Sequence, residues 1–244
     1  MKELNKFIYI FEGLDTAHGI TKKSSEINEK GKNKTTSFTI HKPPLEKLWQ
    51  DHLDGKDPGL GIIPINQENK LKWGCIDVDI YPVDHQAFVK KLQEKNIKAI
   101  VFRSKSGGAH IFMFTKTFVP AIVMRTKLKM IASSIGHARA EIYPKQDYIN
   151  VARGDTGSFL NLPYYDSKNS VRYAFNSKGI KMSLEEFFDY HNEMAMTEEE
   201  LTNFTMSSKT EENDFFKGMS PCFVTLLSDG VPNGQRNNCM YNVG

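Results

Sequence analysis

The pattern of apolar and polar residues predicts several short amphipathic helices. Apolar residues recur at helical spacing in three segments, residues 45–53, 84–96 and 121–135. Asp84 suits the N-cap of the second helix, and Gly136 follows the third, at a position where glycine ends many helices. Each helix is therefore expected to bury one face against the rest of the protein.

A further helical pattern begins near residue 183. Ser183 with Glu186, and Thr197 with Glu200, have the spacing of a capping box, in which each side chain binds the other residue's backbone N–H. The residues that follow are weakly patterned, and Gly244 comes without a stop signal. We therefore expect the natural chain to continue.

Runs of β-branched and aromatic residues predict the strands. They cover residues 73–81, 97–103, 110–115, 140–143, 159–162 and 171–175. A Gly/Ser turn at residues 104–108 joins two of them into a hairpin, so the middle of the chain has the order strand, helix, hairpin, helix, strand. Residues 1–14 are predicted to be a strand entering a turn, and residues 22–37, rich in Lys, Ser and Asn, to be a mobile surface loop. This order predicts an α+β protein.

The composition is that of an ordinary globular protein. Of 244 residues, 39% are hydrophobic and 25% charged, and the mean hydropathy is −0.46. No apolar run approaches the ~18 residues of a membrane span, and the N-terminus lacks a signal peptide, so we expect a soluble, cytoplasmic protein with no membrane partner. Three scattered cysteines, Cys75, Cys222 and Cys239, fit neither a disulfide scaffold nor a zinc site. The net charge of +3 is too small to identify a nucleic-acid ligand.

Two aspartates interrupt the strand predicted at residues 73–81. Asp77 and Asp79 are two residues apart, so in a strand both side chains leave the same face, about 6.5 Å apart at the backbone. Carboxylates so close repel one another unless a cation neutralises them, and oxygen ligands suit Mg²⁺ or Mn²⁺. The alternative is a solvent-exposed strand face.

The predicted hairpin turn carries donors for an anion. In Ser104-Lys105-Ser106-Gly107-Gly108-Ala109-His110, the glycines let backbone N–H groups turn towards a phosphate, and the Ser, Lys and His side chains add further donors. No Walker A motif occurs in the chain, which excludes an ATPase motor. The alternative is an ordinary turn beside a half-buried histidine.

A third acid follows on the strand predicted at residues 140–143. Glu141 and Tyr143 share one face of this strand, so Glu141 is placed to join the two aspartates. Alone, the segment is equally an edge strand in which Glu141 forms a salt bridge.

These motifs, taken in order, resemble the catalytic core of the archaeo-eukaryotic primase superfamily, and most closely the primase-polymerases of phages, plasmids and related conflict systems. The first metal motif is matched by Ile76-Asp-Val-Asp79, the phosphate-binding motif by residues 104–110, and the third acidic motif by Glu141-Ile-Tyr-Pro-Lys145. Ser158-Phe-Leu-Asn161-Leu-Pro163 resembles the strand that commonly follows. The third acid is Glu rather than Asp.

The resemblance implies an RRM-like antiparallel sheet with helices and an N-terminal αβ module. It divides the chain into an N-terminal module at 1–72, a catalytic module at 73–180, and a C-terminal helical extension at 181–244. The residues from Gly234 onward resemble the start of the helical domain that follows the core in relatives.

The implied function is a DNA primase-polymerase that makes and extends primers on single-stranded DNA in the replication of a phage or mobile element. Asp77, Asp79 and Glu141 would bind two Mg²⁺ or Mn²⁺ ions, and His110, Ser104, Lys105, Ser106 and Gly107 would hold the phosphates of a dNTP or NTP. Lys145, Arg103 and Arg153 are candidates for a further contact with a phosphate or the template, and Lys145 is the preferred one. Implied partners are a single-stranded DNA template with its primer, and a helicase domain or protein.

Two other functions remain open from the sequence. Acidic residues with a histidine on a sheet also occur in metal-dependent nucleases and replication-initiator endonucleases, although the His-x-His pair of a relaxase is absent. A non-catalytic RRM-like protein would instead stack bases on Phe112 and Phe114, which are more often core residues than a platform.

Overall fold

The middle of the chain folds into a four-stranded antiparallel sheet with the order β5-β6-β4-β7. Its strands are β4 (Lys70–Val78), β5 (Ile100–Arg103), β6 (Ala109–Pro120) and β7 (Glu141–Tyr143). Helix α3 (His85–Glu94) joins β4 to β5, and α4 (Ala121–Ser134) joins β6 to β7. The connectivity is βαββαβ with the first strand of the unit next to its last, which confirms the predicted RRM-like sheet.

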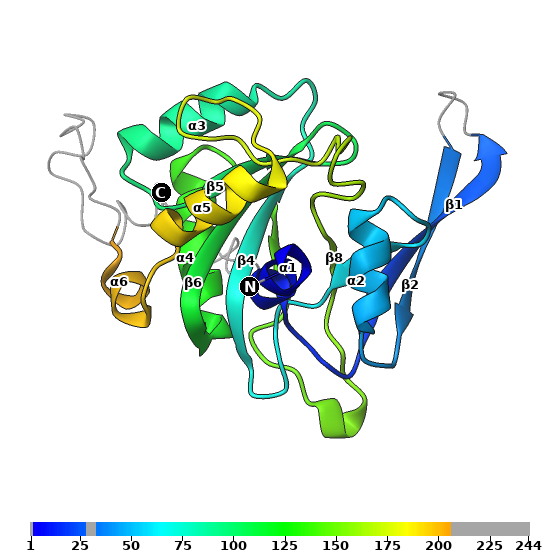
Figure 1. Cartoon of the computed structure of the whole chain (residues 1–244). Coiled ribbons are helices and arrows are strands. Elements are labelled where there is room, and N and C mark those ends of the chain that lie inside the picture. Colours follow the sequence, from blue (N-terminus) through cyan, green and yellow to red (C-terminus); the bar gives the residue numbers. More distant parts are fainter. Residues whose placement is uncertain (1, 28–32, 206–244) are drawn as a thin grey trace, which may run out of the picture. The chain divides into compact units, whose positions relative to one another are not determined.

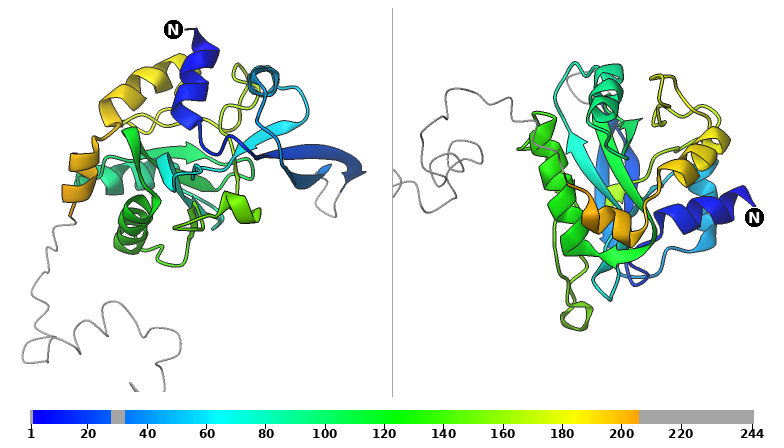
Figure 2. Two further views of the ribbon diagram at one scale, coloured as in Figure 1. Left: turned by 90° about the horizontal axis from the view of Figure 1, so that it is seen from below. Right: turned by 90° about the vertical axis from the view of Figure 1, so that its left-hand side faces the viewer.

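The two faces of this sheet pack against different helices, as Figure 2 shows. One face, which carries Ile76 and Ile111, forms a core with α3 and α4. The opposite face, which carries Trp73 and Phe112, forms an aromatic core with α1 (Glu3–Phe11) and α5 (Leu184–Met194). Because strand side chains alternate between faces, one strand supplies both cores.

A second antiparallel sheet has the order β2-β1-β3-β8. Its strands are β1 (His18–Ile27), β2 (Asn33–Ile40), β3 (Gly59–Ile62) and β8 (Leu160–Asn161), and α2 (Glu46–Leu53) packs beside β3 (Figure 1). Strand β8 follows the RRM-like unit in the chain but pairs with β3 of the N-terminal segment. Strands from two of the three predicted domains therefore share one sheet.

Two predictions for the N-terminal segment are wrong. Residues 3–11 form helix α1 rather than a strand, because Phe7, Ile10 and Phe11 occur at helical spacing and all three are buried. Residues 22–27 and 33–37 lie in strands β1 and β2 rather than in a loop, and these strands pair with each other at seven positions, from His18↔Ile40 to Ile27↔Asn33. The residues predicted as a strand at 171–175 make only isolated bridges, through Ala174 and Phe175.

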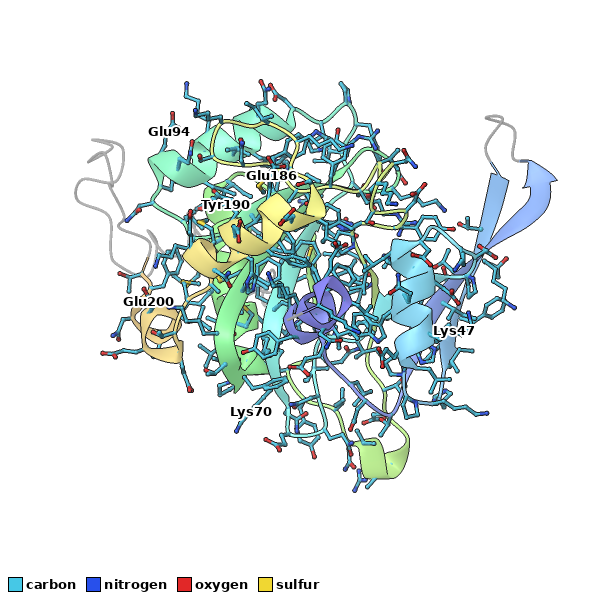
Figure 3. All side chains as sticks on the ribbon, viewed as in Figure 1. Lys47, Lys70, Glu94, Glu186, Tyr190 and Glu200 are labelled. Carbon is cyan, nitrogen blue, oxygen red and sulfur yellow. The ribbon has the colours of Figure 1, made fainter. Side chains whose placement is uncertain are left out.

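The structure, a computed structural model, describes residues 2–27 and 33–205. Both predicted capping boxes are present there, Ser183 with Glu186 at α5 and Thr197 with Glu200 at α6 (Glu198–Asn203), and Figure 3 labels both glutamates. The resemblance at Gly234 and the rest of the predicted extension beyond residue 205 lie outside the described residues. Within the described residues, no helix has the length and apolar character needed to cross a lipid bilayer.

Candidate functional site

The predicted acidic residues meet at one end of strand β4. Asp77 lies on β4 directly opposite His110 of β6 on one side and Glu141 of β7 on the other. Asp79 follows Val78, the last residue of β4, so it lies just beyond the strand rather than within it. The RRM-like topology therefore brings together residues that are 64 positions apart, from Asp77 to Glu141.

A cleft of about 560 Å³, which we call the first cleft, opens beside the two aspartates. It contains most of the predicted site. Its lining comprises Thr21, Thr35, Ser37, Asp77, Asp79, Ser104, Lys105, Ser106, His110, Tyr143, Phe159, Leu160, Asn161 and Arg172. Residues from both sheets form its walls.

The turn between β5 and β6 is closed tightly against the aspartates. The Ser104 N–H donates to the Gly108 carbonyl at 2.8 Å, and Gly107 adopts a positive φ of 94°. A Cβ at Gly108 would lie 2.7 Å from the Val78 carbonyl oxygen and 3.2 Å from Oδ1 of Asp79, so only glycine fits here without displacing its neighbours. This close approach places the turn next to the end of β4.

The backbone of this turn is braced by Arg103. Its Nη1 donates to the Val171 carbonyl at 3.0 Å and lies 3.5 Å from the Ser104 carbonyl oxygen. The guanidinium, predicted as a template or phosphate contact, therefore supports the turn in this structure.

Two buried oxygens in the first cleft lack hydrogen bonds within the described part of the chain. They are Oγ of Ser104 and Oδ1 of Asp77. Nε2 of His110 lies 3.2 Å from Oδ1 of Asp77. Because a buried polar atom without a partner is costly, both oxygens are suited to a ligand or ion that supplies the missing interaction.

The carboxylate oxygens of Asp77 and Asp79 meet only part of what a site for a divalent cation requires. Asp77 has a buried oxygen that accepts no hydrogen bond, and Asp79 accepts a hydrogen bond at 3.0 Å from the Tyr81 hydroxyl at the surface. Oxygen ligands of this kind suit Mg²⁺ or Mn²⁺. However, among residues 2–27 and 33–205 no three His, Cys, Asp or Glu side chains are arranged to hold a metal.

Glu141 is turned towards a lysine instead of the aspartates. Its Oε2 lies 2.8 Å from Nζ of Lys145 and accepts a hydrogen bond at 3.2 Å from the Tyr143 hydroxyl. Lys145 does not line the first cleft. The roles of Glu141 as third metal ligand and of Lys145 as a nucleotide contact therefore stay predictions, and the first requires Glu141 to leave its ion pair.

The phenol of Tyr143 is held in its neutral form. Burial raises the pKa of Tyr143, and the nearby carboxylates of Glu141 and Asp77 raise it further. Since Tyr143 also lines the first cleft, its ring offers a flat, uncharged wall beside the two aspartates.

The second sheet and the segment that follows β8 also line this cleft, which the sequence did not predict. Thr21 on β1 donates to Oδ1 of Asn161 at 2.8 Å and lies 2.9 Å from the Ser37 hydroxyl of β2. Arg172 is buried, and its Nη1 donates to the Leu162 carbonyl at 3.2 Å. Asn161 lies in a motif that the resemblance had marked, but no local pattern around Thr21 or Arg172 indicates a site.

The aromatic residues considered as a base-stacking platform are in the core. Phe112 is fully buried against Phe11, with ring centroids 5.9 Å apart, and Phe114 packs on Phe187 at 6.0 Å. Helices α1 and α5 cover this face. The stacking surface that an RRM-like binder needs is therefore absent from these two positions.

An RRM-like sheet that carries two aspartates at the end of its first strand, beside a Ser/His hairpin, defines the class of archaeo-eukaryotic primase domains. The family model described as the archaeo-eukaryotic primase domain of TOTE conflict systems matches residues 16–202, and the chain belongs to this family. Comparison with curated proteins found no match.

Solved structures of primase RepB′ are also similar to the chain. The catalytic domain of RepB′ in complex with initiator DNA is 13% identical with a TM-score of 0.34, and the match covers 79% of this chain and 96% of that domain. A second RepB′ structure is 12% identical with the same TM-score, and the match covers 79% of this chain and 64% of the other. Both similarities are too low to transfer the role of any residue.

Proposed function

We propose that this chain is a DNA primase-polymerase that transfers a nucleotide from a dNTP or NTP to a 3′-hydroxyl on a DNA template. One observation supports this most strongly: Asp77, whose buried Oδ1 accepts no hydrogen bond and lies 3.2 Å from Nε2 of His110, shares one cleft with that histidine and with the Ser104 hydroxyl, which also lacks a hydrogen bond. The cleft thus combines acidic groups with donors for phosphate. Membership of the primase family is consistent with this chemistry.

The reaction forms one bond and breaks one. The 3′-oxygen of the acceptor bonds to the α-phosphorus, the bond from that phosphorus to the bridging oxygen breaks, and pyrophosphate leaves with the electron pair. The proton of the 3′-hydroxyl passes to water. The protein acts mainly by positioning the reactants and balancing their charges.

Asp77 and Asp79 are the residues that would hold divalent ions, with Glu141 as the third ligand once it leaves Lys145. Bound Mg²⁺ or Mn²⁺ supplies a Lewis acid that lowers the pKa of the attacking hydroxyl and offsets phosphate charge. The side chains themselves hold two negative charges at the end of β4, and these exclude a phosphate from that point unless a cation accompanies it.

The hairpin turn is assigned to the phosphates of the incoming nucleotide. The Ser104 hydroxyl is buried in the cleft without a hydrogen bond, so a phosphate oxygen would satisfy it. Lys105 and Ser106 lie at the exposed tip of the same turn, and His110 is the second residue of β6. Lys105 also lines a neighbouring cleft, together with Arg172 and with two carboxylates, Asp57 and Asp166.

A primer-extension assay tests this function directly. The protein is incubated with a primed single-stranded template, a nucleotide, and Mg²⁺ or Mn²⁺, and the products are sized on a denaturing gel. Elongation supports the proposal, whereas shortened strands identify a metal-dependent nuclease, and binding without any product identifies a non-catalytic protein. The same assay without primer shows whether the chain also starts new strands.

A further inference from the structure

Asp77 and Asp79 also line a second cleft, of about 600 Å³. Its remaining lining is formed by Val78 and Ile80 and by residues 136–141, which lead from α4 into β7. The first cleft is lined by the hairpin turn, by His110 of β6 and by Tyr143 of β7, whereas the second is lined by the segment that leads into β7. The two aspartates form part of the wall of each cleft.

Two clefts that share the same carboxylates fit a reaction with two substrates. In phosphoryl transfer, the attacking and leaving oxygens lie roughly in line through the phosphorus. With the triphosphate in the first cleft, pyrophosphate leaves towards the Ser104 turn. The attacking hydroxyl then approaches from the opposite side of Asp77 and Asp79, which is the side of the second cleft.

Three carboxylates, Asp77, Asp79 and Glu141, line the second cleft together with one arginine, Arg139, which is suited to a phosphate of a nucleic-acid backbone. Arg139 is exposed there, and among the described residues no carboxylate forms an ion pair with it. Ile80, which is 58% exposed, adds an apolar surface suited to a sugar or base. Unlike the first cleft, this one contains none of the Ser and Lys side chains of the hairpin turn.

The segment that carries Arg139 is held in place by the end of helix α4. Gly136 has a φ of 85°, its N–H donates to the Ser133 carbonyl at 3.0 Å, and the His137 N–H donates to the Ala132 carbonyl at 2.7 Å. This pair of bonds is the Schellman ending of a helix, which fixes the direction of the chain that follows. The His137 ring also packs on Phe88, with centroids 5.0 Å apart. Arg139 therefore extends from an anchored backbone.

We propose that the second cleft binds the 3′-terminal segment of the primer strand and that Arg139 contacts one of its phosphates. The inference rests on the proposed function, since it assigns the acceptor of the same reaction to a place in the structure. It makes Arg139 a positioning residue for the primer, distinct from the residues assigned to the incoming nucleotide.

DNA binding by Arg139→Gln tests the assignment. Fluorescence anisotropy measures the affinity of the protein for a template that carries a recessed 3′ primer end and for the same template without primer. Both affinities are measured over a range of salt concentrations. We expect the wild type to bind the primed DNA more tightly. R139Q should lose this preference, and its affinity for primed DNA should be about 5- to 10-fold lower than that of the wild type. The slope of log K against log salt concentration should be smaller in magnitude by about one, because one phosphate contact is lost.

Two further variants sharpen the test. Lys129→Gln removes the same charge from the exposed side of α4, outside the second cleft, and should bind both DNAs like the wild type. Arg139→Lys should recover part of the preference, because it keeps the charge. In extension assays, R139Q should raise KM for the primer and leave KM for the nucleotide unchanged.

Several results would overturn the inference: equal affinity of the wild type for the two DNAs, equal weakening of both by R139Q, or a change in KM for the nucleotide alone. The binding measurement decides the role of Arg139 even for a protein that extends no primer. Absence of extension by the wild type instead contradicts the proposed function, so the two failures are distinguishable.

Discussion

His110 lies beside Asp77 and faces the first cleft, so its side chain has two possible partners, the carboxylate and a bound phosphate. A histidine that only orients Asp77 affects the chemical step. A histidine that also donates to the triphosphate affects nucleotide binding as well. Kinetics therefore separate the two roles.

We predict that His110→Ala lowers kcat/KM for the nucleotide about 10- to 100-fold, because the variant loses one hydrogen bond to a charged group. A rise in KM should account for part of the loss. Steady-state extension at varied nucleotide concentration measures both constants. His41→Ala, at an exposed position outside the cleft, is the control. Unchanged constants in H110A would assign the histidine a purely structural role.

The hairpin of β5 and β6 is the element on which the geometry of the site depends. Its turn approaches β4 so closely that Gly108 has no room for a side chain. In addition, Nε2 of His85 lies 3.0 Å from the Gly108 carbonyl oxygen, which ties α3 to the same turn. A change of one atom at Gly108 must therefore move the turn or the end of β4.

We predict that Gly108→Ala lowers extension activity by at least about 10-fold and lowers the free energy of unfolding by about 1–3 kcal/mol, as overpacking typically does. Gly59→Ala is the matched control, because a Cβ there would meet its neighbours at 3.6 Å or more. Urea unfolding and primer extension measure the two effects. If G108A and G59A have the same stability and the same extension activity, the close approach of the turn to β4 does not matter for function.

The elements predicted correctly are those with strong local signals. The caps at Asp84, Ser183 and Thr197 and the Gly/Ser turn at residues 104–108 all have side-chain chemistry that selects one backbone conformation. Helix α1 was missed because Phe7, Ile8, Tyr9 and Ile10 form a continuous apolar run, which favours a strand as well as a buried helix. Strands β1 and β2 were missed because most of their residues are polar, so no alternation of apolar and polar positions marks them in the sequence.

At the scale of the whole molecule, the site is built by contacts between distant segments. Asp77, His110 and Glu141 were predicted to meet because the motifs follow the order of a known family. Thr21 and Arg172 line the first cleft beside β8, which pairs with β3: Thr21 donates to Asn161, and Arg172 donates to the Leu162 carbonyl. Such long-range pairing has no signature in a local sequence window, which is why this wall of the cleft was not predicted.

The buried His52 links α2 to strand β3 and to the segment that follows β8. Its Nδ1 accepts from the Leu60 N–H at 3.0 Å, and its Nε2 lies 2.9 Å from the Pro163 carbonyl oxygen, as expected for a neutral ring that donates there. Burial lowers the pKa of His52 to about 3, and the charge of Arg172 lowers it too. His191 is also buried, which lowers its pKa to about 4.

We predict that acid destabilises the protein through these histidines. Their pKa values in the folded state lie below the ordinary value of 6.5, so stability is full above that pH and falls as the pH drops towards 3 or 4. Between the ordinary and the folded-state pKa, the free energy of unfolding falls by about 1.4 kcal/mol per pH unit for each histidine. Urea unfolding from about pH 7.5 to about pH 4.5 measures it. His52→Asn should show a shallower pH dependence, and equal slopes in the two proteins would contradict this origin.

We propose that Asp77 and Asp79 hold the divalent ions for nucleotidyl transfer, and substitution of each by asparagine tests this role most directly. Primer extension and DNA binding are measured in parallel for Asp77→Asn and Asp79→Asn, with Asp189→Asn on the exposed side of α5 as the control. We predict that both variants lose extension in Mg²⁺ and in Mn²⁺ while binding primed DNA as tightly as the wild type or slightly more tightly, because each substitution removes a metal ligand and a negative charge beside the phosphates. D189N should extend normally. Near-wild-type extension by D77N or D79N in either metal would contradict the claim.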